Sequence, residues 1–196
     1  FMLTGGLRYD MGRLSVSEFY DPLLAEFLML QGYTQENVEF YAMRSANLYK
    51  VFGDLSGSVG IEYRLSTIHS LKLNVGRSFR YPGANELSSN GLHHGAFRHE
   101  QGNGDLKSER GYQLDIDYQY ANGGLNVRVN PFVSWFENYI YLEPTGSWSV
   151  LPHAGQIYRY NEAEALVTGG ELMIGYEISD RWSVNGEVEY VFNRNI

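Results

Sequence analysis

The sequence contains no cysteine, only 5 prolines among 196 residues, and no apolar run of the length that a transmembrane helix needs. The absence of cysteine excludes a disulfide framework and a thiolate metal site. Basic residues are also scarce, with 15 Lys and Arg against 23 Asp and Glu and a formal net charge of −8. Because a protein neutralises nucleic-acid phosphates with clustered Lys and Arg, this balance argues against a nucleic-acid partner.

Tyrosine and glycine are abundant instead, with 16 and 22 residues. Both suit sheets, turns and the aromatic girdles found at membrane interfaces. A strict period of two is clearest where polar residues alternate with Tyr112, Leu114, Ile116, Tyr118 and Tyr120. This alternation predicts a β-strand with one apolar and one polar face.

The same pattern predicts seven strands in the whole chain. They cover approximately residues 1–10, 51–65, 70–79, 112–120, 126–141, 171–178 and 182–192. In the fifth strand, the alternation places Val133, Trp135, Tyr139 and Tyr141 on one face.

Short turns and long connections alternate strictly between these strands. The turns lie at 66–69, 122–124 and 179–181, and the long connections at 11–47, 80–109 and 143–156. The sequence therefore predicts an all-β fold, an antiparallel up-and-down meander with all its long loops at one end. In the first loop, Asp21 followed by Pro22 predicts a short helix, because Asp caps helix N-termini and Pro is favoured in the first turn.

Two kinds of protein share this pattern. Long loops at one end and short turns at the other are typical of an outer-membrane β-barrel, whose apolar faces meet lipid. A soluble antiparallel sheet would instead bury those faces in a core, and would bind a glycan or a partner protein through its long-loop end. The position of Leu114, Ile116 and Tyr118 separates the two, because they lie on the convex outer face of a barrel but between two layers of a soluble sheet.

Two motifs flank the second long loop. The first is Phe79-Arg80-Tyr81-Pro82, followed by Glu86-Leu87, and the second runs from Asn103 to Glu109 with the sequence NGDLKSE. Together they resemble the "FRAP … NPDLKPE" signature in the barrels of TonB-dependent outer-membrane receptors. Tyr160-Asn161 and Gly169-Gly170-Glu171-Leu172 are similar to a following strand of that family. The matching signature residues are Phe79, Arg80, Pro82, Asn103, Asp105, Leu106 and Glu109, whereas Tyr81 and Gly104 replace the usual Ala and Pro.

The resemblance implies a fold, a location and an activity. It implies that residues 1–196 are about seven strands of a large transmembrane barrel of about 22 strands, without the plug domain. The whole receptor would lie in the outer membrane of a Gram-negative cell, in contact with lipid, with its long loops extracellular. It would bind a scarce metal ion, haem or metal chelate and import it with energy supplied by TonB through the plug. No enzymatic chemistry is implied.

A histidine-rich segment lies between the two motifs. Residues 91–102 resemble a "G-V-H-H-x-x-x-x-x-E-x-G" insert in family members that are receptors for zinc, copper or haem. Imidazole is a good ligand for these metals, so His93 and His94 are candidate metal ligands. The wider candidate set for ligand binding is Glu86, His93, His94, His99 and Glu100. Two other interpretations stay open: the histidines pack the loop by bonding backbone carbonyls, or they form a polar surface that faces a siderophore.

Overall fold

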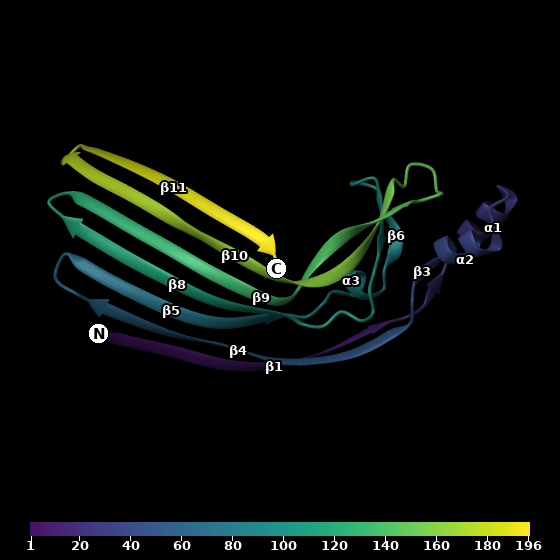
Figure 1. Ribbon diagram of the computed structural model, residues 1–196, viewed down its shortest axis with the longest axis horizontal. Coiled ribbons are helices and arrows are strands. Elements are labelled where there is room, and N and C mark those ends of the chain that lie inside the picture. The colour runs from purple at the N-terminus through teal and green to yellow at the C-terminus, as the bar shows by residue number, and fades with distance from the viewer.

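The computed structural model describes residues 1–196 and contains one long, curved, mostly antiparallel sheet (Figure 1). Seven long strands pair in chain order and do not close into a ring, because β1 and β11 do not pair with each other. They are β1 (Met2–Val16), β4 (Leu48–Arg64), β5 (His69–Arg80), β8 (Glu109–Asn122), β9 (Leu125–Trp148), β10 (Gln156–Ser179) and β11 (Trp182–Asn195). The predicted meander and its strand number are confirmed.

The long connections all lie at one end of the sheet, as predicted. The first contains β2 (Phe19–Tyr20), α1 (Pro22–Leu30), α2 (Gln35–Ala42) and β3 (Met43–Ser45). The second contains α3 (Ala84–Ser88), β6 (Asn90–His93) and β7 (Arg98–Gln101). The third connection was predicted to be long but comprises only residues 149–155, between β9 and β10. We call this the loop end of the molecule. No helix of the chain is both long and apolar enough to cross a membrane.

The apolar face of the sheet is uncovered. Val59 pairs with Val75 and Val75 with Leu114, so these side chains form a continuous row across β4, β5 and β8. Val59 and Val75 are both 59% exposed and Leu114 is 39% exposed. No second layer packs on them, which excludes the two-layer soluble sheet for this structure. The face is that of a barrel wall.

The buried core lies at the loop end instead. One cluster joins α1 to α2 through Ala25, Leu28, Val38, Tyr41 and Ala42. A second joins the loops to the strands through Leu87, Leu106 and Ile140, with Leu14, Leu48, Phe52 and Tyr160 packed against it. The sheet thus has its apolar side chains outside along the wall and inside among the loops.

This change of side explains why the first strand was predicted too short. β1 continues to Val16, whereas the alternation of Leu3, Leu7 and Tyr9 stops near residue 10. Met11 is the last exposed apolar residue on that face, and Leu14 has the opposite parity and packs inward against the second cluster. A pattern search for one constant apolar face cannot follow such a switch.

Other predicted boundaries also change. β9 extends to Trp148 and β10 begins at Gln156. The loop predicted at 143–156 therefore comprises only residues 149–155. A bulge in β9 is the second correction: Phe136 pairs with Ala165 but Tyr139 with Ala163, so β9 contains one extra residue. Asn138 there has φ of 53°. Tyr139 and Tyr141 therefore share the face of Phe136, and their predicted place on the face of Trp135 is wrong.

The predicted helix is confirmed, with Asp21 as its N-cap. The Asp21 Oδ1 accepts a hydrogen bond of 3.0 Å from the Leu24 backbone N–H, and Pro22 begins α1. The second helix, α2, was not predicted, although Thr34 caps it in the same way by accepting from Asn37 N–H at 3.3 Å. Its sequence is polar and short, and most of its stability comes from packing on α1.

Candidate functional site

The loop end is assembled from all three long connections. β7 pairs with β10 in parallel, with His99 opposite Ile157, so the β6–β7 hairpin extends the main sheet. The loop 149–155 contacts α2 and the turn before it: the Tyr41 hydroxyl accepts from Val150 N–H at 2.9 Å, and the Tyr33 hydroxyl donates to the Val150 carbonyl at 3.0 Å. Segments far apart in the sequence therefore form one surface.

The charged signature residues come together at the base of this assembly. Arg80 donates to both oxygens of Glu86, at 2.7 and 2.9 Å, and to Glu109 at 3.2 Å. Glu86 also accepts from Gly83 N–H at 2.7 Å, and Glu109 from Ile140 N–H at 2.9 Å. One arginine thus ties the start of the second loop to its end and to β9.

The remaining signature residues pack or turn the same loop. Leu106 is buried against Leu87, and Pro82 is also fully buried. The Asn103 Oδ1 accepts from Asp105 N–H at 3.1 Å, which fixes the turn before Leu106. The signature is therefore an architectural brace, and Glu86 belongs to it.

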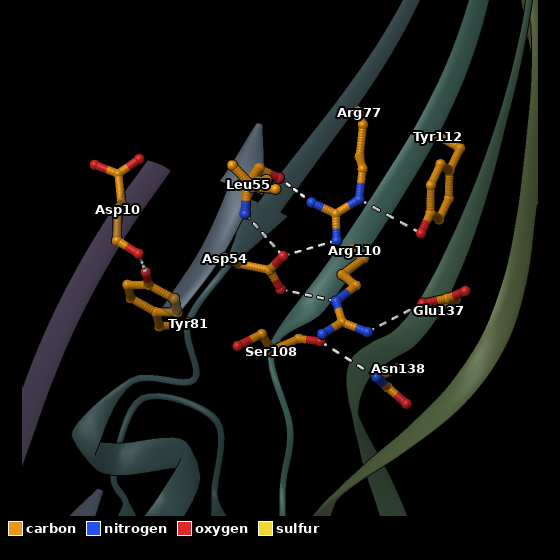
Figure 2. Close-up of polar contacts among 10 residues, drawn as sticks. All are labelled: Asp10, Asp54, Leu55, Arg77, Tyr81, Ser108, Arg110, Tyr112, Glu137 and Asn138. Carbon is orange, nitrogen blue, oxygen red and sulfur yellow. Dashed lines mark hydrogen bonds and ion pairs between the residues drawn. The ribbon is translucent and has the colours of Figure 1, made fainter. Parts of the chain in front are cut away.

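Tyr81, which directly follows Arg80 of this brace, fills a split in the wall (Figure 2). β4 and β5 pair only as far as Gly57 and Arg77, and beyond that pair the two strands separate. The Tyr81 ring stacks on Phe52, with 5.3 Å between the centroids, and its edge lies against Gly12. A Cβ at Gly12 would lie 3.0 Å from the ring, so a larger residue there would push the ring aside by a few tenths of an ångström.

An ionic cluster spans the same split. Asp54 is 7% exposed and accepts from Arg77 and Arg110, each at 2.7 Å (Figure 2). Arg110 also contacts Glu137 at 3.5 Å, and Arg77 bonds the Leu55 carbonyl. The cluster links β4, β5, β8 and β9. The sequence offered no signal for it, because each residue sits in a different strand.

The five histidines do not gather. His93 and His94 lie exposed at the tip of the β6–β7 hairpin, where the His93 Nδ1 accepts from Ala96 N–H at 3.2 Å. His99 is fully buried and its Nε2 lies 2.6 Å from the Asn90 Oδ1. Burial, and then the Arg44 guanidinium, lower the pKa of His99 to about 4, so it is neutral near pH 7.

The other candidate carboxylate is also engaged. Glu100 pairs with Arg98 at 2.7 Å and accepts from the Tyr160 hydroxyl at 3.3 Å. Burial, and then the charge of Glu100, raise the pKa of the Tyr160 phenol. No group of three or more His, Asp and Glu side chains is placed to hold a metal ion. Of the five candidate residues, His93 and His94 are thus the two that lie exposed and outside an ion pair or a buried contact.

The whole chain matches a known family. Residues 1–195 match the family model described as TonB dependent receptor-like, beta-barrel. The chain belongs to this family.

Three solved structures have the same fold as this chain. A copper transporter, OprC, is 20% identical with a TM-score of 0.71, and the match covers 98% of this chain and 27% of OprC. The Serratia marcescens hemophore receptor HasR, solved with its hemophore HasA and heme, is 17% identical with a TM-score of 0.67, covering 97% and 31%. The Pseudomonas aeruginosa siderophore receptor PirA is 16% identical with a TM-score of 0.61, covering 76% and 30%. This chain therefore spans less than a third of each of these family members.

One residue of the loop end was missed in the sequence and is central in the structure. Asn90 reads as part of an Asn-Gly turn signal, yet it lies in β6 and its side chain reaches into α2. The Asn90 Nδ2 donates to the carbonyls of Phe40 and Met43, at 2.5 and 2.8 Å. Only the packing of two long loops against each other gives it these partners.

Proposed function

We propose that this chain is part of an outer-membrane receptor that binds a scarce metal ion, haem or metal chelate and imports it with TonB-coupled energy. The observation that carries the proposal is a one-layer antiparallel wall with an uncovered apolar face and folded loops at one end, in a chain of the TonB-dependent receptor family. Such a face is stable in lipid and aggregates in water.

The names of the similar structures support this choice of ligand class. These are a copper transporter, a receptor in complex with its hemophore and heme, and a siderophore receptor. His93 and His94 are the side chains of this chain that we propose for first contact with such a ligand, because they are exposed at the hairpin tip. Zn, Cu and haem iron accept neutral imidazole, and a ferric chelate accepts hydrogen bonds from the same rings.

The rest of the receptor would supply what this chain does not. In this proposal the plug domain transmits energy from TonB and contributes to the ligand site, and lipid covers Val59, Val75 and Leu114. The loop end would be extracellular. Binding and import require no bond to be made or broken in the ligand, so the chain is not proposed as an enzyme.

The test is a titration of the full-length receptor in detergent with Zn²⁺, Cu²⁺ and haem, comparing wild type with His93→Ala/His94→Ala. We expect the double variant to lose at least tenfold in affinity for one of the three, and the wild-type affinity to fall in acid, because metals bind the neutral imidazole and not its protonated form. His153→Ala is the matched control, because His153 is an exposed histidine in the neighbouring loop. Unchanged binding in the double variant would indicate that His93 and His94 only pack the loop. It would also favour an organic metal chelate as the ligand.

A further inference from the structure

Residues 19–45 form a unit with its own core, which we call the helical cap. The two helices enclose Ala25, Leu28 and Val38, which are at most 2% exposed. The ends of the cap are closed on each other, because Tyr20 of β2 pairs with Met43 of β3 and Asp21 N–H bonds the Ala42 carbonyl at 2.8 Å. A segment that is closed and packed in this way can move as one body.

Two short links join the helical cap to the wall. Residues 17–18 lead into it from β1 and residues 46–47 lead out to β4, and neither pair belongs to a helix or strand. The links lie side by side, since the Ser45 hydroxyl donates to the Ser17 carbonyl at 2.9 Å. This is the arrangement of a double-stranded hinge, in which a few loop residues absorb the change in backbone angles.

Asn90 fastens the helical cap to the β6–β7 hairpin. Its Nδ2 bonds the carbonyls of Phe40 and Met43, which lie at the C-terminal end of α2 where carbonyls lack partners within the helix. Because Nδ2 donates both bonds, Oδ1 accepts from the Nε2–H of His99. The His99 ring in turn stacks on Phe40, with 5.8 Å between the centroids. The His99 Nδ1 is buried without a partner, which marks this contact as incompletely satisfied.

The remaining contacts of the helical cap are with the two neighbouring loops, where Leu151 packs against the core of the cap and the Tyr41 ring meets the His99 ring at 5.3 Å between centroids. Ser45 forms an isolated antiparallel bridge with Ser89, and the Tyr33 and Tyr41 hydroxyls bond the backbone of Val150. The outer side of α1 is uncovered, with Leu23 77% and Leu30 79% exposed. An apolar stripe of this kind gives the cap a second surface that it can bury in another position.

We propose that the helical cap is a hinged lid at the loop end and that Asn90 is the latch that holds it closed. The latch acts through a side chain that is replaceable without changing the hinge or the core of the cap. Asn90 is therefore a positioning residue for ligand entry rather than a ligand contact, and this gating role rests on the proposed uptake function. The movement of the lid does not depend on the proposed uptake function.

The experiment measures the lid without any ligand. The chain has no cysteine, so spin labels at Glu26→Cys in α1 and Ser78→Cys in β5 report the distance between lid and wall. Full-length receptor in nanodiscs, with any cysteines elsewhere replaced, is compared by pulsed electron paramagnetic resonance with and without Asn90→Ala. Loss of two buried hydrogen bonds predicts that the ratio of open to closed lid rises by roughly tenfold or more. The matched control is Asn85→Ala, an exposed asparagine in α3, which is expected to leave the distances unchanged.

An engineered disulfide that locks the lid gives an independent measurement if Asn90→Ala does not fold. Ser45→Cys and Ser89→Cys replace a bridged pair, and a disulfide between them ties the lid to the β6 side. We expect oxidation to remove the label-to-label distance of the open lid and to stop uptake. Reduction is expected to restore both the open distance and uptake. The lid is overturned if Asn90→Ala shows only the label-to-label distance of the wild type. It is also overturned if the Ser45→Cys/Ser89→Cys variant shows the same single distance when oxidised and when reduced. Uptake that persists in the oxidised receptor overturns gating but leaves the receptor function intact. Absence of uptake in every form, with distances that still change, would overturn the uptake function and leave the lid.

Discussion

The Tyr81 hydroxyl donates a hydrogen bond of 2.7 Å to the backbone carbonyl of Asp10, a residue 71 positions earlier in the chain. The bond crosses the split between β4 and β5, and the Tyr81 ring fills the space that the separated strands leave. Tyr81 is one of the two signature positions at which this chain departs from the family pattern. Here the departure is a structural element of the wall.

We expect Tyr81→Ala to destabilise the receptor by about 2–4 kcal/mol, because it removes both the ring and the hydrogen bond. Tyr81→Phe keeps the ring and is expected to cost about 1 kcal/mol. Unfolding of the full-length receptor in urea, followed by tryptophan fluorescence, measures both. Tyr63→Ala is the matched control, since Tyr63 is 51% exposed on the wall. Equal losses of stability in Tyr81→Ala and Tyr63→Ala would contradict the role of Tyr81 in filling the split.

The Asp54 cluster gives a second prediction. Asp54→Asn leaves Arg77 and Arg110 without their shared carboxylate, so we expect a loss of about 1–3 kcal/mol, reduced from the fully buried case because both arginines are partly exposed. Asp10→Asn is the control, because Asp10 pairs with Arg8, which is 75% exposed. The same urea unfolding measures both variants, and a control that costs as much as Asp54→Asn would rule the cluster out as a special contact.

Gly102 is predicted to be irreplaceable for a steric reason. A Cβ there would overlap the backbone nitrogen of Ser88 and the backbone of Leu87 and Ser89, so the second loop could not close on α3. We expect Gly102→Ala to cost about 1–3 kcal/mol, as overpacking usually does. Gly95→Ala, whose Cβ would lie no closer than 3.5 Å to any neighbour, should be nearly neutral. Amide hydrogen exchange of residues 84–106 locates the damage; similar protection in the two variants would refute the assignment.

His99 predicts how the stability of the loop end depends on pH. Its folded pKa of about 4 lies below the ordinary value of 6.5, so the unfolded or undocked form binds the proton more tightly. The docking free energy is therefore complete above pH 6.5 and falls as the pH is lowered to 4, by about 3 kcal/mol at most. Asn90, Phe40, Tyr41 and Ile157 surround the ring, and Arg44 is the charged group that opposes its protonation.

The measurement is hydrogen exchange of α2 and β7 between pH 7.5 and 4.5, corrected for the intrinsic rates. Protection should decline with acid in wild type and in His94→Gln, an exposed histidine of the same hairpin. It should stay level in His99→Gln, which cannot be protonated. Acid-dependent loss of protection in His99→Gln would assign the effect to another group.

The wall of this protein was predictable because strand side chains point alternately to opposite sides. Where a strand has an uncovered apolar face on one side and polar residues on the other, as at Leu114 and Asp115, the alternation is visible in the sequence. The turns and α1 were predictable for a local reason too, since Asn122-Gly123-Gly124 and Asp21-Pro22 fix the backbone within a few residues. The signature motif was recognisable, but its role as a brace was not, because Arg80 meets Glu109 only in the folded chain.

The sequence by itself thus determined the strands, the side of the long loops and the family. Only the tertiary structure decided what the loops do. Leu14 changes sides because a cluster of loop residues covers the inner face at the loop end, and Tyr139 changes sides because Asn138 adds one residue to β9. The fates of the histidines were decided in the same way: His99 is buried by a helix almost 60 residues earlier in the chain, and His93 is left in solvent. Contacts over such separations depend on which loops pack together, and no local pattern of residues encodes that choice.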